Sequence, residues 1–201
     1  SYDTPYIDPV DIMDAKKTLP ENVFKQEYMA AFIDSGGEVF SNLDKNTFTQ
    51  YPRPLGKIFC GIDLGKQEDY TVATFVDSRG QIVDIYRSNA QEWTTMVNEI
   101  LVRIRKHNAT VMVEVNSIGD VIFEMIKRQW QDTHPFVTTS KSKQEIIEGL
   151  ILDMNDTAIT IPDVGLFSWL YNELSMFTYS YNPKTPSNLY LIVYGSNSKH
   201  Q

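Results

Sequence analysis

The stretch at residues 57–65, Lys-Ile-Phe-Cys-Gly-Ile-Asp-Leu-Gly, constrains the fold of this chain more than any other. It is a short apolar run with β-branched and aromatic residues, which is typical of a buried strand. Its single carboxylate, Asp63, follows the apolar residues and stands between Gly61 and Gly65. The pattern therefore predicts a strand that carries one negative charge to its end.

A second strand of this kind is predicted at residues 110–116, Thr-Val-Met-Val-Glu-Val-Asn, where Glu114 lies within an apolar segment. A carboxylate is costly to bury without a partner. Two carboxylates on neighbouring strands repel each other unless a divalent cation lies between them. The sequence therefore predicts that Asp63 and Glu114 form part of a divalent-metal site. Asn116, two residues further along, is a candidate to orient the Glu114 carboxylate.

Composition limits both the size of the core and the choice of partners. With 201 residues and 42% hydrophobic content, the chain can bury one full core, and its single cysteine, Cys60, is expected to be a core thiol. The formal net charge of -8 argues against a general nucleic-acid coat, because non-specific DNA affinity comes mainly from Lys and Arg. No segment has the length of a membrane span or the pattern of a signal peptide, so we expect a soluble intracellular protein.

Hydrophobic periodicity predicts a mixed central sheet covered by helices on both faces. Three antiparallel strands come first, and further strands then alternate with helices. The expected strands lie at 58–63, 70–77, 81–87, 110–116 and 136–138, and a closing hairpin joins 179–181 to 189–194. The expected helices lie at 92–106, from about 118, at 141–154 and at 166–177. In the second of these helices, the residues expected to face inward are Val121, Ile122, Met125 and Ile126.

The first fifty residues differ from the rest of the chain. Residues 1–20 contain prolines and scattered acids without periodicity, which indicates a linker, whereas residues 21–33 place Phe24 and Tyr28 on one face of an amphipathic helix. The segment 51–56 is rich in Pro and Gly and separates this region from the first strand. We therefore expect an N-terminal extension over residues 1–50 and a compact domain over residues 51–201.

The motif Gly61-Ile-Asp-Leu-Gly65, followed by Asp69-x-Thr71, occurs in two kinds of protein. It is used by ribonuclease-H-like folds, and the Asp-x-Gly turn also resembles the phosphate loop of the sugar kinase, actin and Hsp70 superfamily. A member of that superfamily would also need a second lobe, for which 201 residues leave no room. An actin-like or sugar-kinase-like ATP-binding protein is therefore the weaker alternative.

The complete set of motifs resembles the C-terminal nuclease domain of the large terminase subunit of tailed bacteriophages. The motifs follow one another in the order of that family: the segment 20–32, the Asp63 strand, Val113-Glu-x-Asn-x-x-Gly119, Ser140-Lys-Ser-Lys143, Ile161-Pro162 and Glu173-Leu-x-x-Phe177. The resemblance runs from about residue 20 to the end of the sequence. It implies a ribonuclease-H-like endonuclease that cuts concatemeric viral double-stranded DNA during genome packaging.

The resemblance also implies a mechanism with two Mg2+ or Mn2+ ions held by three acids. Asp63 matches the first acid and Glu114 the second, and Asp69 is a candidate accessory ligand. One metal would activate a water as the nucleophile, and the other would stabilise the leaving 3′ oxygen. Lys143, together with Lys141, is a candidate to contact phosphate or to balance the charge of the acids, and His200 is a candidate to touch metal or the scissile phosphate.

The third acid of the family usually follows a Tyr-Gly turn near the end of the domain. Here the run that starts at Tyr194 reaches His200, and the next residue is Gln201, a neutral and weaker metal ligand. We therefore expect the third acid at or just beyond the C-terminus. Three other acids near expected helix ends are weaker candidates, because acids are common there as caps: Asp153, Asp156 and Asp163.

The family's large subunit also contains an N-terminal ATPase domain, whose Gly-x-x-x-x-Gly-Lys-Ser/Thr motif is absent from this sequence. The resemblance implies that this ATPase domain, the small terminase subunit and the portal are partners, that no membrane is involved, and that the protein acts in the host cell cytoplasm. Two alternatives stay open: a non-catalytic packaging module with an incomplete acid cluster, or another ribonuclease-H-like enzyme such as a resolvase or a ribonuclease. The segment Phe24-Lys-Gln-Glu-Tyr28 disfavours the second.

Overall fold

The computed structural model describes residues 9–18, 24, 39–40, 42–65, 69–89, 92–115, 119–181 and 190–194. The chain divides into two compact units. The first, called the sheet unit, comprises Phe48–Gln144 and Ala158–Ile161 and contains Asp63 and Glu114. The second, called the hairpin unit, comprises Ser1–Thr47, Glu145–Thr157 and Pro162–Gln201. The domain boundary expected at residue 51 stays a prediction.

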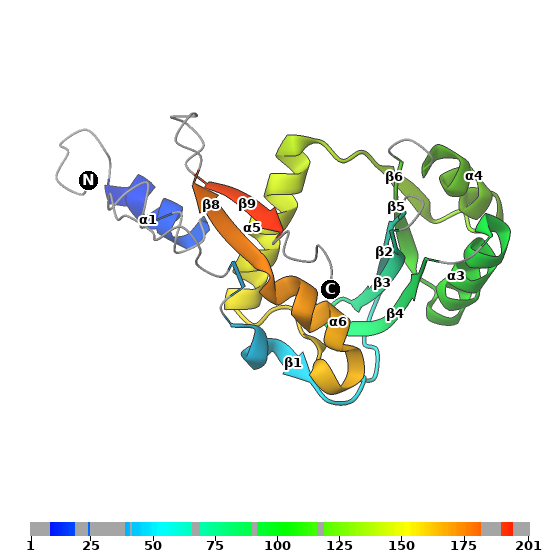
Figure 1. The fold of residues 1–201 in the computed structure, drawn as a ribbon, viewed down its shortest axis with the longest axis horizontal. Coiled ribbons are helices and arrows are strands. Elements are labelled where there is room, and N and C mark those ends of the chain that lie inside the picture. The colour runs from blue at the N-terminus through cyan, green and yellow to red at the C-terminus, as the bar shows by residue number, and fades with distance from the viewer. Residues whose placement is uncertain are drawn as a thin grey trace, which may run out of the picture. The chain divides into compact units, whose positions relative to one another are not determined.

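A five-stranded mixed sheet in the order β4-β3-β2-β5-β6 forms the centre of the sheet unit (Figure 1). Its first three strands are the expected antiparallel meander: β2 (Ile58–Asp63), β3 (Thr71–Asp77) and β4 (Ile82–Ser88). β5 (Thr110–Glu114) then pairs with β2 in parallel, as predicted for the strand that carries Glu114. The meander and the parallel neighbour together confirm the predicted mixed sheet.

The last strand of the sheet, β6 (Thr133–Phe136), is parallel to β5 and lies earlier in the sequence than predicted. The expected strand at residues 136–138 begins where β6 ends. Only Thr133 of this strand is fully buried, while His134 and Pro135 are exposed. The short strand therefore lacks the apolar alternation that marks a strand in sequence.

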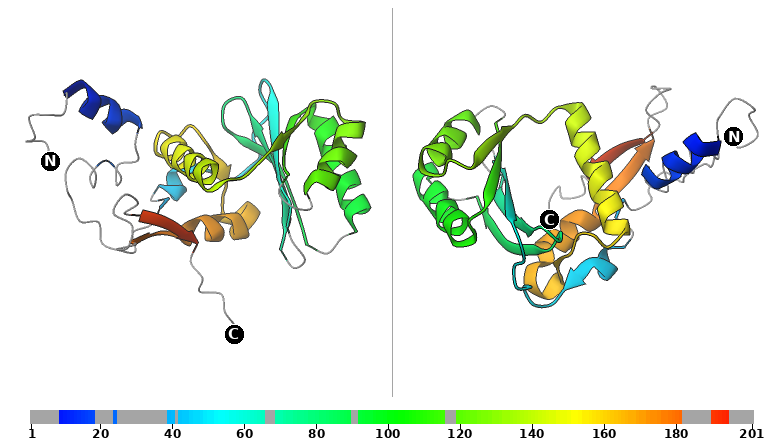
Figure 2. Two further views of the ribbon diagram at one scale, coloured as in Figure 1. Left: turned by 90° about the horizontal axis from the view of Figure 1, so that it is seen from above. Right: turned by 180° about the vertical axis from the view of Figure 1, so that it is seen from behind.

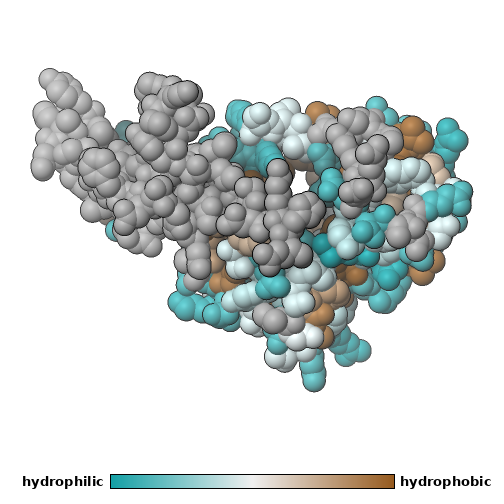
Figure 3. All heavy atoms as spheres, in the orientation of Figure 1, coloured by the Kyte–Doolittle hydropathy of each residue, from teal (hydrophilic) through white to brown (hydrophobic). Residues whose placement is uncertain are grey.

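Two helices, α3 (Trp93–His107) and α4 (Gly119–Gln129), cover one face of this sheet (Figure 2). β2 alternates strictly, so that Ile58, Cys60 and Ile62 face the helices and are buried while the residues between them are exposed. Cys60 is 1% exposed, which confirms the core thiol, and burial raises the pKa of that thiol. The surface over the two helices mixes hydrophilic residues with isolated apolar ones (Figure 3).

The buried stripe of α4 is narrower than its sequence indicates. Ile122 and Ile126 are buried one helical turn apart, as expected, but Val121 is 63% exposed and Met125 is only partly buried. A helix that covers a sheet with a two-residue stripe leaves the flanking apolar residues in water. The prediction that Val121 faces inward was therefore wrong.

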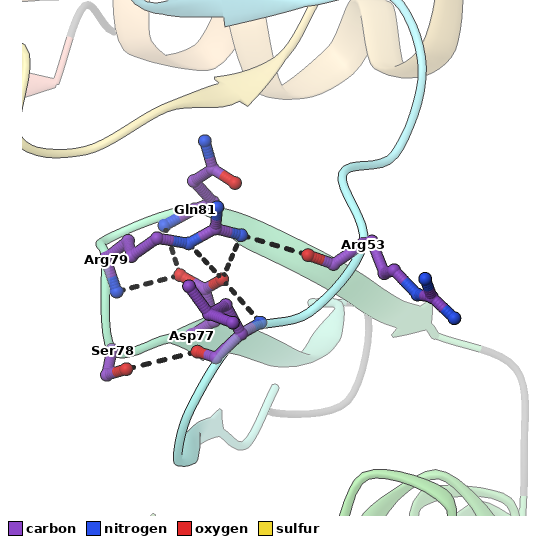
Figure 4. A network of polar contacts seen from close by, with 6 residues as sticks. Arg53, Asp77, Ser78, Arg79 and Gln81 are labelled. Carbon is purple, nitrogen blue, oxygen red and sulfur yellow. Dashed lines mark hydrogen bonds and ion pairs between the residues drawn. The ribbon is translucent and has the colours of Figure 1, made fainter.

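The turn between β3 and β4 is held by a buried carboxylate, Asp77, whose side chain is fully buried (Figure 4). Asp77 accepts hydrogen bonds from the backbone N–H groups of Leu55 at 3.0 Å, Arg79 at 2.9 Å and Gln81 at 3.2 Å. The Arg79 guanidinium adds an ion pair at 2.7 Å and also donates to the Arg53 carbonyl at 2.9 Å. Burial acts to raise the pKa of Asp77, but these hydrogen bonds outweigh it and hold that pKa below its usual value. The network ties the segment before β2 to the turn between β3 and β4.

The hairpin unit contains most of α5 (Ser140–Asn155), which begins in the sheet unit, and α6 (Val164–Ser175). The side chain of Asp163 accepts a hydrogen bond from the Leu166 N–H at 3.1 Å, so this acid is the N-cap of α6. The closing hairpin is confirmed, because β8 (Phe177–Tyr181) pairs antiparallel with β9 (Tyr190–Tyr194). Phe177, expected at the end of a helix, is the first residue of β8.

Three short elements also occur among the described residues: the 3-10 helix η1 (Leu43–Asn46), β1 (Thr47–Phe48) and β7 (Ile161–Pro162). The side chain of Asn46 fixes η1 within the hairpin unit by donating to the carbonyls of Asn42 at 2.9 Å and Met154 at 2.8 Å. Tyr171 of α6 donates to Asp44 at 2.6 Å. These hydrogen bonds join η1 to both α5 and α6.

The expected linker at residues 1–20 contains a helix, α1 (Pro9–Thr18). Proline is well suited to the first position of a helix. Among the described side chains of α1, only that of Ala15 is buried. The apolar residues Val10, Ile12 and Met13 do not form a single face of this helix, so no apolar periodicity reveals it in the sequence. The amphipathic helix predicted at residues 21–33 falls, apart from Phe24, outside the described residues.

In the parts of the chain that the structure describes, no helix has the length and apolar character needed to cross a membrane.

Candidate metal centre

Asp63 and Glu114 end two adjacent parallel strands. Ile62 of β2 pairs with Val113 of β5, so the next position on each strand brings the two acids to the same level of the sheet. Because side chains alternate along a strand, both acids project from the face opposite the buried residues Ile62 and Val113. The two carboxyl groups share a hydrogen bond. The structure thus places the two acids together, as the sequence predicts.

The Asp63 carboxyl has a pKa raised to about 6. The largest cause is partial loss of hydration at the carboxyl, although the residue as a whole is exposed; the hydrogen bond and the negative charge of Glu114 follow. The Leu64 backbone N–H and the positive charge of Lys143 act in the opposite direction. A carboxyl pair with this pKa holds a proton more readily than an isolated carboxyl does, which is the behaviour of two like charges held close together.

The raised pKa predicts that Asp63→Asn stabilises the metal-free chain at neutral pH. The folded-state pKa of about 6 lies above the unfolded value of about 3.9, so the stability that this proton provides is present below pH 4 and is lost as the pH rises through 6. Because Asp63 is exposed to solvent, we expect a gain of only about 1 kcal/mol at pH 7.5 and none at pH 4. Thermal unfolding in EDTA measures the difference; a variant less stable than the natural chain at pH 7.5 contradicts the prediction.

Gly119, at the start of α4, allows that helix to begin against the end of β5. A Cβ atom at this position would collide with the backbone carbonyl of Glu114 and would lie 3.7 Å from Leu64 Cδ1. The end of β5 is also fixed from its other side, where the Val115 N–H donates to the Phe136 carbonyl at 2.9 Å. Close packing of α4 on the backbone at Glu114 therefore requires glycine at residue 119.

We predict that Gly119→Ala destabilises the chain by about 1–3 kcal/mol, because the neighbour that must move is backbone rather than a flexible side chain. The shift is also expected to move Glu114 and to weaken metal binding. Gly149→Ala is the matched control, since a Cβ there meets no described atom within 4 Å. This variant is expected to raise the free energy of unfolding by about 0.5–1 kcal/mol, because alanine is favoured over glycine within the α5 helix. Urea unfolding of both variants is the measurement, and equal stabilities contradict the packing argument.

The other predicted site residues have different positions. Asp69 is exposed just before β3, and the Gly65 N–H donates to Thr71 Oγ1 at 3.1 Å across the same loop. Lys143 is exposed in the first turn of α5, where its charge lowers the pKa of Asp63, in keeping with a charge-balancing role. Lys141 is exposed two residues earlier. The roles of these residues as ligands or phosphate contacts stay predictions.

Asn116, His200 and Gln201 lie outside the described residues, so the structure does not test their predicted roles. Within the described ranges, no group of three His, Cys, Asp or Glu residues could hold a metal ion. Among the weaker candidates for the third acid, Asp163 is occupied as the α6 N-cap. The described part of the chain thus brings Asp63 and Glu114 together, and their role as metal ligands and the place of the third acid stay predictions.

Arg87 and Tyr70 lie near the acids and were not identified from the sequence. Arg87 is the residue of β4 that pairs with Val72, and Val72 in turn pairs with Asp63. Tyr70 directly follows Asp69 in the motif around Thr71, which is the one signal that the sequence offered. The position of Arg87 depends on the register of the β2–β3 and β3–β4 pairs. The β3–β4 pair shifts register at an irregularity between Phe75 and Val76.

Comparisons with known proteins agree with this geometry, although no family model matches the chain. The terminase large subunit of Thermus virus P23-45 is 29% identical over an alignment of 165 residues, which covers 75% of this chain and 34% of that protein. The crystal structure of the large terminase nuclease from the thermophilic phage G20c matches with a TM-score of 0.62 and 26% identity, over 77% of this chain and 87% of that one.

The chain resembles the nuclease domain of phage large terminase subunits in both sequence and fold. The ribonuclease-H-like fold class is thereby confirmed. The chain spans about a third (34%) of the length of the curated relatives it matches. A G20c nuclease structure with bound magnesium matches it with a TM-score of 0.65 and 24% identity, over 80% of this chain and 88% of that one. The G20c nuclease has also been solved with cobalt and with zinc.

Proposed function

We propose that this chain is the metal-dependent nuclease domain of a phage packaging terminase and that it cleaves double-stranded DNA. The observation that carries the proposal is the Asp63–Glu114 pair, placed at the ends of two parallel strands of a ribonuclease-H-like sheet. The sequence relationship to terminase large subunits supports this substrate over RNA or a branched junction.

The chemistry of the two acids fits divalent cations. Carboxylate oxygens are the preferred ligands of Mg2+ and Mn2+. Partial loss of hydration, followed by the hydrogen bond and the charge of Glu114, raises the Asp63 pKa to about 6, and a dication between the two acids would favour their ionised forms. When bound, such ions supply an activated water and stabilise negative charge on the scissile phosphate and on its leaving oxygen. We infer that both acids, together with a third acid, hold two ions, and that Asp69 supports them.

The protein itself would fix the acids and balance their charge. β2 and β5 fix the two carboxylates through main-chain pairing, and Gly119 allows α4 to support the end of β5 from behind. Lys143 provides a positive charge close enough to lower the pKa of Asp63, so more of this carboxyl is ionised at neutral pH. We propose that Lys143 and His200 also contact the DNA phosphate.

The partners of this chain follow from the same proposal. Because the chain corresponds to about a third of a large terminase subunit, an ATPase domain, the small terminase subunit and the portal would bring DNA to it in the host cytoplasm. This division of labour suits the net charge of -8, which provides little general affinity for DNA. Concatemeric viral DNA is the substrate that we propose for the assembled machine.

The test is incubation of the chain with supercoiled plasmid in Mn2+, in Mg2+ and in EDTA. We expect nicking and linearisation with either metal and none in EDTA. A version extended beyond Gln201 is assayed in parallel, because the third acid is expected at or after that position. If both versions bind DNA without cutting it, the non-catalytic packaging module is the better account; preferential cleavage of RNA or of a four-way junction would favour the other ribonuclease-H-like enzymes.

A further inference from the structure

Strand pairing places a cation on the same row of the sheet as the two acids. Directly paired residues of adjacent strands project from the same face, so the pairs Asp63–Val72 and Val72–Arg87 put Arg87 on the face that carries Asp63 and Glu114. Arg87 is two strands away from Asp63, or roughly 10 Å between backbones. A side chain of the length of arginine can extend over much of that interval.

The Arg87 guanidinium is stacked on an aromatic ring. Its central carbon, Cζ, lies 3.5 Å from the centre of the Tyr70 ring, which is close enough for cation–π and planar stacking contacts. Stacking of this kind restricts the guanidinium to a fixed plane, and the N–H donors of a guanidinium lie along the edge of that plane. Tyr70 remains 42% exposed. A stacked arginine beside a partly exposed aromatic ring is suited to a nucleic-acid backbone and its bases.

Gly61 provides the second observation, from the strand that carries Asp63. It lies two residues before Asp63 on the same face of β2, and no described atom comes within 4 Å of a Cβ placed there. Gly61 needs no positive φ, and glycine in a strand interior costs about 0.5–1 kcal/mol, so neither backbone geometry nor packing explains it. Glycine at such a position often marks a close approach of a ligand.

We propose that one strand of duplex DNA crosses this face of the sheet, passing over Gly61 and reaching Arg87. The backbone approaches β2 closely because Gly61 has no side chain, and Arg87, held by Tyr70, binds a phosphate next to the scissile phosphate at the metal ions that Asp63 and Glu114 would hold. The inference rests on the proposed nuclease function. It assigns Arg87 as a DNA-positioning residue and explains Gly61 by the space that the strand requires.

The first test removes the Arg87 charge. Fluorescence anisotropy with a labelled 20-base-pair duplex in Ca2+ compares the full chain, Arg87→Ala, Arg87→Lys and Arg105→Ala. Arg105 is the matched control because it is exposed at the end of α3, on the opposite face of the sheet. We expect Arg87→Ala to weaken binding roughly tenfold and to reduce the slope of log K against log salt by about 1, with Arg87→Lys in between and Arg105→Ala unchanged.

The second test fills the space at Gly61. Valine has a higher strand propensity than glycine, so Gly61→Val should unfold at the same or a higher temperature while its DNA binding falls roughly tenfold. Gly61→Ala should show a smaller loss. The same assays with a single-stranded oligonucleotide show whether one DNA strand is sufficient for binding. If it is, both variants should bind the oligonucleotide more weakly, as they bind the duplex more weakly.

The outcomes separate this inference from the proposed function. If the natural chain cuts DNA in a metal-dependent manner but Arg87→Ala and Gly61→Val bind and cut as it does, the strand path is wrong while the nuclease proposal stands. If Arg87→Ala is unfolded, Arg87→Lys and Gly61→Val still decide. Equal losses in Arg87→Ala and Arg105→Ala would also contradict the proposal, because they would indicate a general charge effect.

Discussion

Asp63→Ala is expected to reduce metal-dependent cleavage of plasmid DNA by about a thousandfold or more, which corresponds to roughly 4 kcal/mol of transition-state stabilisation. The reason is that Asp63 and Glu114 are at the same level of two paired strands, so a cation held by both loses half of these ligands when Asp63 is replaced. Initial rates of nicking in Mn2+ over a range of enzyme concentrations provide the measurement.

Asp132→Ala is the matched control for this loss of a carboxylate. Asp132 is exposed, and it binds Thr110 Oγ1 at 2.6 Å and His134 at 3.0 Å, at the opposite end of β5 and β6 from Glu114. Its replacement should leave the cleavage rate within about twofold of that of the natural chain, because surface substitutions far from a site have small effects. Cleavage that survives Asp63→Ala would show that the acids assigned here do not hold the catalytic metal.

Asp77→Ala is expected to have the largest effect on stability, about 3–5 kcal/mol in urea unfolding. The substitution leaves three backbone N–H groups without their acceptor, those of Leu55, Arg79 and Gln81, and removes the partner of the Arg79 guanidinium. The buried Asp77 carboxylate is the acceptor for all three part-buried donors, so the loss of these hydrogen bonds and of the ion pair carries most of the cost. A change below 1 kcal/mol would mean that the turn reorganises around the missing carboxylate and would contradict the prediction.

The same carboxylate makes a prediction for acid unfolding. The folded-state pKa of Asp77 is lowered, so its contribution to stability is present above the unfolded pKa of about 3.9 and is lost as the pH falls through the folded-state pKa. The natural chain should therefore lose stability steeply below about pH 4, whereas Asp77→Asn should start lower and fall less. Parallel curves for the two proteins would exclude Asp77 as a source of the acid sensitivity.

The sequence predicts the centre of the sheet unit well because its signals there are strong and local. The alternation of Ile58, Cys60 and Ile62 is that of a strand with one buried face, and the repeat in α3 is helical over its whole length. Glu114 in an apolar strand stands out because few structural roles justify it. The fold and the pair of acids follow from these patterns and from the right order of motifs.

Features that depend on tertiary context cannot be predicted from these local patterns. The apolar residues of α1 do not gather on one face, and the exposure of Val121 depends on how α4 lies across the sheet rather than on its own sequence. Arg87 comes into line with Asp63 only through the register of β4, β3 and β2. The place of the third acid likewise depends on how the C-terminal residues fold, which no local periodicity expresses.

Binding of Mn2+ to the metal-free chain tests the central claim most directly, because it needs neither DNA nor turnover. Electron paramagnetic resonance of free Mn2+ during a titration measures the bound metal in the natural chain, in Asp63→Asn, in Glu114→Gln and in Asp132→Asn. We predict that the natural chain and Asp132→Asn bind Mn2+ equally and that both Asp63→Asn and Glu114→Gln lose at least tenfold in affinity while staying folded. Unchanged Mn2+ affinity in Asp63→Asn and Glu114→Gln would contradict the assignment of these two acids as a metal centre.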